Sequence, residues 1–103
     1  MARRQLVQKH KSDSVQGDGS WVEMRKMTVA EMRKVEEHID QEGNYEYSIR
    51  KIEENLVKWN WADEEGQELP LPKNDPTVLD GLTAEEFNFL CRCLVGGEQA
   101  LKN

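Results

Sequence analysis

The sequence predicts a small α+β domain, because helical and extended patterns follow one another within 103 residues. Apolar residues recur at helical spacing in three segments, and they alternate with polar residues around two tryptophans. Glycine or proline separates most of these segments. With 37% hydrophobic residues, the chain can build one modest core. We expect a short N-terminal strand, an antiparallel helix pair, a tryptophan-bearing β-hairpin and a C-terminal helix.

Residues 1–19 form a basic leader that we expect to be disordered. Its first eleven residues hold four basic side chains and no acidic one, and polar residues and glycines follow up to Gly19. Such a composition buries too little apolar surface to become ordered. The first eleven residues leave 10 of the 14 basic and all 20 acidic side chains to the other 92 residues. An acidic body disfavours nucleic-acid and membrane partners, so we predict neither.

The folded domain is expected to span residues 20–97, with residues 98–103 as a frayed tail. Residues 21–27 read as a short strand, although Val22 breaks the strict alternation of apolar and polar residues. The longest apolar run in the chain is far shorter than the about 20 residues that a membrane-spanning helix needs. We therefore predict a protein that stays in the cytoplasm.

Two short helices follow the strand. Thr28 and Glu31 have the spacing of a capping box, in which each side chain accepts a hydrogen bond from the other residue's backbone N–H. The apolar stripe of the first helix consists of Val29, Met32, Val35 and Ile39. Gly43 is placed to end this helix. The stripe of the second helix consists of Tyr45, Ile49, Ile52 and Leu56. Helices joined by so short a turn are expected to pack as an antiparallel pair.

The pattern then changes to alternation, which predicts a β-hairpin. Trp59 and Trp61 share one face of a strand that begins at Val57, and polar residues occupy the other face. Gly66 closes an acidic turn that begins at Asp63, and residues 67–69 supply the partner strand. Prolines at positions 70 and 72 end that strand. The two tryptophans are expected to lie in the core.

The C-terminal third of the chain contains the strongest apolar signal. Asp75-Pro76 is typical of the start of a short helical turn, and Thr83 with Glu86 repeats the capping-box spacing. The helix that follows, from Ala84 to Val95, carries apolar side chains over about 240° of its circumference, whereas a surface helix needs about 100°. It is therefore either the central helix of the domain or a surface for another chain. The residues that we expect to bind a partner are Phe87, Phe89, Leu90, Cys93 and Leu94, with Trp21 beside the leader.

No arrangement of residues predicts catalysis, a cofactor or a metal ion. Adjacent glutamates on a helix point about 100° apart and usually face water. The acidic turn after Trp61 lacks the later oxygen ligands of a calcium loop. Cys91 and Cys93 are two positions apart, so on a helix they point about 200° apart and neither pair nor share a metal. We expect them to be small buried hydrophobic side chains in a reducing compartment, and we expect the protein not to be an enzyme.

The order of these motifs resembles that of small tail assembly chaperones of long-tailed bacteriophages. The resemblance covers about residues 20–95. The segments that carry it are residues 21–28 with Glu31, residues 56–61 with Asp63 and Gly66, residues 69–72, Asp75-Pro76 and residues 82–87. The set as a whole, rather than any single segment, is typical of the family.

The resemblance implies a non-enzymatic protein of the infected bacterial cytoplasm. Such a protein would hold the long tape measure protein in solution and help to recruit tail tube protein around it. It would act as a homo-oligomer or as many copies on one client, and it would correspond to the short form of a chaperone that also has a frameshifted long form. Two other classes stay open from the residues alone. One is a structural virion component of the tail or connector, and the other is a small regulator of a host protein.

Overall fold

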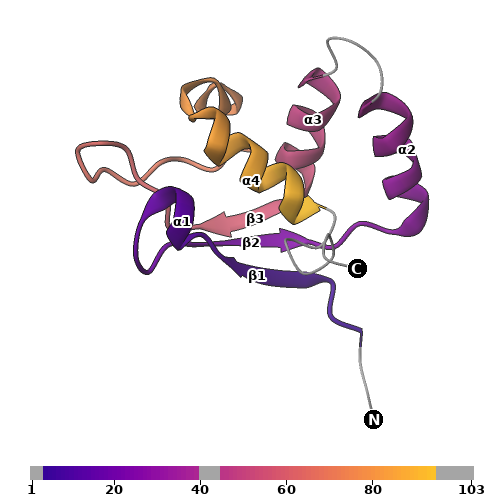
Figure 1. Cartoon of the computed structure of the whole chain (residues 1–103), viewed down its shortest axis with the longest axis horizontal. Helices are drawn as coiled ribbons and strands as arrows, with labels where there is room; N and C mark the ends of the chain where they lie inside the picture. The colour runs from indigo at the N-terminus through magenta and orange to yellow at the C-terminus, as the bar shows by residue number, and fades with distance from the viewer. Residues whose placement is uncertain (1–3, 40–44, 95–103) are drawn as a thin grey trace.

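The computed structural model describes residues 4–39 and 45–94, and it confirms a small α+β domain. Figure 1 shows the order of its elements. They are β1 (Val7–Lys11), α1 (Asp13–Gln16), β2 (Trp21–Arg25), α2 (Val29–Ile39), α3 (Tyr45–Asn55), β3 (Leu56–Trp59), the 3₁₀-helix η1 (Pro76–Gly81) and α4 (Ala84–Leu94). No helix in the described ranges is long and apolar enough to cross a membrane.

The strands form an antiparallel sheet in the order β1-β2-β3, and this corrects the expectation of a disordered leader. Residues 7–11 pair with β2 and residues 13–16 form α1, so disorder is wrong for this part of residues 1–19. The glycines that suggested disorder instead make the connection to β2. Gly17 and Gly19 have φ values of 108° and 83°, a region that other residues rarely adopt.

Strand β2 is the central strand and supplies one side of the core. Val22 and Met24 are buried on the side of the sheet that the helices cover, while Trp21, Glu23 and Arg25 point to the other side and are half-buried. Val22, which broke the expected alternation, therefore lies on the core face. The strand ends at Arg25, two residues before the expected end at Met27.

The expected tryptophan hairpin is only partly present, because the main partner of β3 is β2. Trp59 lies opposite Val22 in the sheet, and both side chains are buried. The turn itself is confirmed: the N–H of Asp63 donates to the carbonyl of Gln67, and Gly66 has a φ of 82°. Beyond the turn, pairing is limited to an isolated bridge between Ala62 and Glu68 and a hydrogen bond from Leu69 to Trp61.

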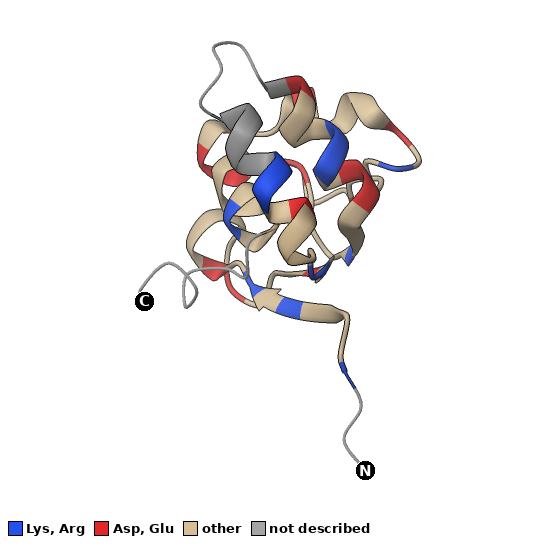
Figure 2. Ribbon diagram, turned by 90° about the vertical axis from the view of Figure 1, so that its right-hand side faces the viewer, with Lys and Arg blue, Asp and Glu red and all other residues tan. Residues whose placement is uncertain are grey.

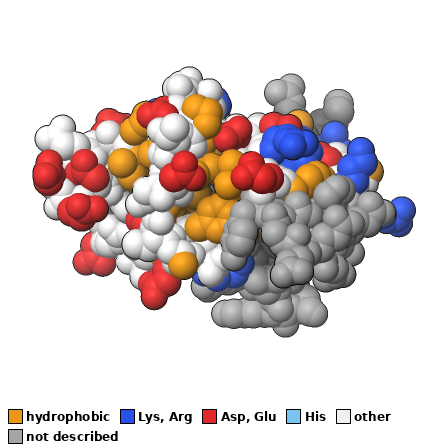
Figure 3. Space-filling model, turned by 90° about the horizontal axis from the view of Figure 1, so that it is seen from above, with side chains coloured by type: hydrophobic (Ala, Val, Ile, Leu, Met, Phe, Trp, Pro, Cys, Tyr) orange, Lys and Arg blue, Asp and Glu red, His pale blue; other side chains and the backbone are white. Residues whose placement is uncertain are grey.

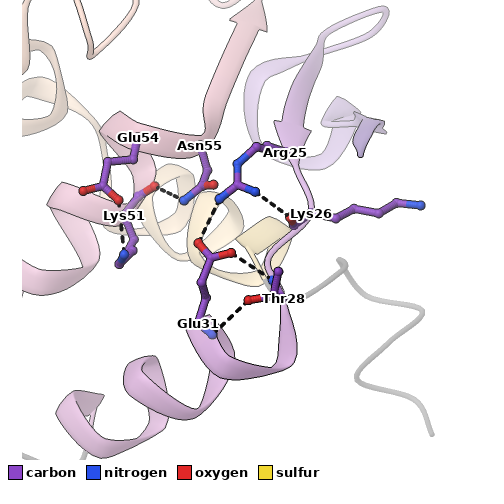
Figure 4. Close-up of polar contacts among 7 residues, drawn as sticks. All are labelled: Arg25, Lys26, Thr28, Glu31, Lys51, Glu54 and Asn55. Carbon is purple, nitrogen blue, oxygen red and sulfur yellow. Dashed lines mark hydrogen bonds and ion pairs between the residues drawn. The ribbon is translucent and has the colours of Figure 1, made fainter. Parts of the chain in front are cut away.

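The helices lie on the core face of the sheet, and both predicted capping boxes are confirmed. In Figure 1, α3 and α4 lie above the strands. Helix α2 runs beside α3, so α2 and α3 are antiparallel neighbours, as expected. At the start of α2, the N–H of Thr28 donates to Glu31 at 3.0 Å and the N–H of Glu31 donates to Thr28 at 3.2 Å (Figure 4). The expected helix end at Gly43, the end of α4 beyond Leu94 and the tail 98–103 lie outside the described residues.

The core is built around the two tryptophans and α4. The rings of Trp59 and Trp61 are stacked with their centroids 4.9 Å apart, and the ring of Phe89 lies 6.2 Å from that of Trp61. Each indole N–H is satisfied: Trp59 donates to the carbonyl of Leu69, and Trp61 donates to the buried hydroxyl of Ser12 at 2.8 Å. The expectation that both tryptophans belong to the core is therefore confirmed.

Candidate partner-binding groove

Helix α4 is the central helix of the domain, which corrects the expectation that it presents spare apolar surface. Four of the five residues predicted on it are buried in the core, with 0–6% of their surface exposed: Phe89, Leu90, Cys93 and Leu94. They are covered because α4 packs against α3, α1 and β2 at once. Phe87 is half-buried at the margin of the core. These residues therefore do not form an exposed binding surface in the described structure.

Trp21 lies on the opposite side of the sheet from α4, so the structure does not bring it together with Phe87. Its ring is half-buried, and the ammonium group of Lys9 lies 4.5 Å from the ring centroid. The backbone N–H of Trp21 donates to the side-chain oxygen of Asn60 at 2.8 Å. The cation therefore occupies the aromatic face that a partner would otherwise use.

A groove of about 530 Å³ lies at the end of the domain where α1, the acidic turn, η1 and the start of α4 meet. We call it the end groove. Its apolar lining consists of Val15, Ala62, Leu69, Val78 and Leu82. Its polar lining includes Gln16, Asp63, Glu64, Thr77, Thr83 and Glu86. Figure 3 shows hydrophobic side chains in the middle of the helical face, with acidic side chains around them.

Gln16 joins three of the segments that line the end groove. Its side-chain oxygen accepts from the N–H of Ala62 at 3.1 Å, and its side-chain nitrogen donates to the carbonyl of Ala62 at 3.0 Å. The same nitrogen donates to the carboxylate of Glu86 on α4. One amide side chain thus joins α1, the chain after β3 and the last helix.

Glu86 is a structural carboxylate rather than a free one. Only 8% of its surface is exposed, and both oxygens are engaged. One oxygen accepts from the N–H of Thr83 at 2.8 Å in the capping box, and the other accepts from Gln16. A buried carboxylate that is hydrogen-bonded in this way fixes the first turn of α4.

The acidic rim of the end groove is fixed by the turn. The carboxylate of Asp63 accepts from the N–H groups of Glu65 and Gln67, both at 2.9 Å, which is the side-chain arrangement that stabilises a tight turn. The side chains of Glu64 and Glu65 remain exposed. The rim therefore holds negative charge beside an apolar lining.

The part of the groove lining that η1 contributes is set by the cap of this helix. Asp75 accepts from the N–H of Thr77 at 3.1 Å and from its hydroxyl at 2.6 Å, with Pro76 at the first helical position, as the sequence predicted. This cap places Thr77 and Val78 along the groove. Leu79 of the same turn is buried and anchors this part of the lining to the core.

The thiol of Cys91 on α4 is partly buried. Burial raises the pKa of the Cys91 thiol to about 11, so it is protonated at neutral pH and is a poor nucleophile. Within the described ranges, no three His, Cys, Asp or Glu side chains are grouped to hold a metal ion. The end groove can cover an apolar segment, and its rim favours a segment that also carries positive charge.

The sequence interpretation missed the end groove because two of its residues, Val15 and Gln16, belong to the leader. One signal was present: Ser12 precedes a short polar and apolar turn, and Gly17 and Gly19 follow it, as in a connection between paired strands. The contact between Gln16 and Ala62 joins positions far apart in the chain, so no local pattern predicts it.

Comparison with models of protein families, with curated protein sequences and with solved structures gave no match to this chain.

Proposed function

We propose that this chain is a non-enzymatic binding protein whose end groove covers an apolar, basic segment of a partner protein. The observation that carries this proposal is the combination of apolar lining and acidic rim in one groove. More specifically, we propose a tail assembly chaperone of long-tailed bacteriophages that acts in the cytoplasm of the infected cell. The resemblance supports this, since Asp63, Leu69, Thr83 and Glu86 belong both to the motifs that carry it and to the groove.

The physical demands on such a chaperone agree with the groove and with the charge of the chain. Its client would be the tape measure protein, whose long helices would expose apolar stripes before the tail tube protein surrounds them. A groove that covers part of a stripe removes apolar surface from water. The net charge of −6 keeps the resulting complex in solution. Many copies on one client would add up to a stable complex through avidity, although each contact is small.

The test is co-expression of the chain with a candidate tape measure protein, followed by measurement of how much client is soluble and co-purifies. Two variants probe the groove. Val78→Asp places a charge in the apolar lining, and Glu64→Lys reverses a charge at the exposed rim. Val29→Asp is the matched control, because Val29 is 66% exposed on α2 and does not line the groove.

We expect the wild-type chain and Val29→Asp to keep the client soluble, and both groove variants to lose most of this effect. Circular dichroism and thermal unfolding of each variant separate lost binding from lost folding, with Glu64→Lys as the variant least able to disturb the core. If the wild-type chain leaves the client insoluble, the chaperone proposal is wrong. If mass spectrometry finds the chain as a regular component of purified virions, a structural tail or connector role replaces it.

A further inference from the structure

The beginning of the described chain offers a segment with the properties that the end groove favours. Among the described residues, three large hydrophobic side chains are exposed, and two of them are neighbours: Leu6 is 45% exposed and Val7 is 43% exposed. Arg4 and Lys9 flank them, and both are exposed. We call residues 4–9 the N-terminal segment. Figure 2 shows the basic residues along β1 and the chain before it.

The N-terminal segment and the end groove are complementary in two respects. Leu6 and Val7 are apolar, as are Val78 and Leu82 in the groove lining. The segment is positively charged, whereas Asp63 and Glu64 make the rim negative. Exposed apolar side chains lose contact with water when they enter such a groove, and opposite charges guide the two surfaces together.

A molecule cannot place this segment in its own groove. The segment leads directly into β1, whose five residues are paired with β2, and the chain then enters α1, which is part of the groove wall. Figure 1 shows the N-terminal end of β1 and the groove-forming elements α1 and η1 at opposite ends of the sheet. The N-terminal segment and the end groove of one molecule therefore cannot contact each other, and each is open to a different molecule.

We propose that the occupant of the end groove in the absence of client is the N-terminal segment of a second copy of this chain. The proposal rests on the end groove being the binding site of the proposed function, and it adds the identity of a partner. Because segment and groove lie at opposite ends, each copy can engage two neighbours, head to tail. A contact of this kind builds open chains or rings rather than a closed dimer.

The experiment is sedimentation velocity on the full chain, without client, over a range of protein and salt concentrations. The wild-type chain should form species larger than a dimer as its concentration rises, and added salt should weaken them. Leu6→Asp alters the segment, and Val78→Asp alters the groove. Each should weaken association at least about tenfold, as expected for the loss of one buried aliphatic side chain. Val29→Asp, at the third exposed hydrophobic position, should associate like the wild type.

A mixture of the two variants gives the sharpest result. Leu6→Asp keeps an intact groove and Val78→Asp keeps an intact segment, so an equal mixture should form a dimer of one copy of each and stop there. A wild-type chain that is monomeric throughout, or that stops at a dimer, would overturn the proposal. So would a mixture of the two variants that stays monomeric.

The outcome is separable from that of the proposed function. Client solubility is measured with a second protein present, whereas self-association is measured without one. A wild-type chain that stays monomeric but keeps the client soluble contradicts only the head-to-tail contact. If Val78→Asp loses self-association and still keeps the client soluble, the head-to-tail contact stands and the groove is not the client site.

Discussion

Gln16 of α1 donates a hydrogen bond to Glu86 of α4 across 70 positions of the chain. The same amide is bonded to the backbone of Ala62 through both its oxygen and its nitrogen. The beginning of the chain is thereby fastened to its last described helix, and the end groove lies at this junction. Gln16 thus contributes both to the stability of the domain and to the shape of the groove.

Replacement of Gln16 should lower the stability of the domain and disturb the shape of the end groove. In Gln16→Ala, the part-buried N–H of Ala62 and one oxygen of Glu86 lose their partner, and we expect a loss of about 1–3 kcal/mol in the free energy of unfolding. Urea denaturation followed by tryptophan fluorescence measures it. Gln67→Ala is the control, since the side chain of Gln67 is exposed and its turn contacts are made by the backbone. Equal stability of the two variants would contradict the role given to Gln16.

Phe89 tests whether α4 is core or surface. Phe89→Ala should cost about 3–5 kcal/mol, because it leaves a cavity beside Trp61, and this is a large part of the stability of a domain of this size. The neighbouring exposed residue gives the comparison: Asn88→Ala should change the free energy of unfolding by less than about 0.5 kcal/mol. If the same denaturation experiment shows only a small effect at Phe89, α4 is a surface helix and its assignment to the core is wrong.

Glu31 should make the start of α2 sensitive to acid. Hydrogen bonds from the backbone and hydroxyl of Thr28, and the guanidinium of Arg25 at 2.8 Å, hold the pKa of Glu31 below its ordinary value of 4.5 (Figure 4). The pKa is lower in the folded state, so the stabilisation is present above pH 4.5 and is lost as the pH falls through the folded-state pKa.

The variant Glu31→Gln isolates this charge, since glutamine can still serve in a capping box. At pH 7 it should be less stable than the wild type by about 0.5–1 kcal/mol, because the ion pair is only partly shielded from solvent. The difference should shrink as the pH is lowered below 4.5. Glu64→Gln, at an exposed position, should show no such dependence. A difference that is constant from pH 7 to pH 3 would rule out the charge as its source.

Cys91 should react slowly with alkylating reagents. With a thiol pKa of about 11 instead of 9.0, the thiolate fraction at pH 8 is lowered about a hundredfold. Alkylation by iodoacetamide, located by fragmentation mass spectrometry, should be slower in the native chain by at least this factor than in urea. Between pH 8 and pH 10 the native rate should rise about tenfold per pH unit. A native rate that levels off near pH 9 would show an ordinary thiol.

Local chemistry made several elements of this fold predictable. Both capping boxes, the Asp75-Pro76 turn and the positive φ of Gly66 depend on residues within four positions of one another, and each is present as expected. Helices α2, α3 and α4 follow from the same kind of signal. The sequence also predicted correctly that Trp59 and Trp61 lie in the core, because large aromatic side chains in a small domain have few other places to be buried.

The errors concern contacts between distant parts of the chain. The polar composition of the leader predicts disorder, but β1 needs little apolar surface of its own when the neighbouring strand supplies Val22 and Met24. Likewise, the wide apolar surface of α4 matched either a central helix or a binding surface. Whether α4 is central or exposed depends on how many other elements pack around it. The spacing of apolar residues within the helix does not predict that number.

Strand β1 lies at one border of the described sheet, and this placement bears on how the protein avoids aggregation. The backbones of Leu6 and Ser12 bond toward β2, so by alternation the backbone groups of Val7, Lys9 and Lys11 point away from it. A second β1 added antiparallel here would bring lysines face to face, which is unfavourable. This border therefore disfavours the addition of a second β1, a useful property for a protein whose proposed task is to keep another chain dissolved.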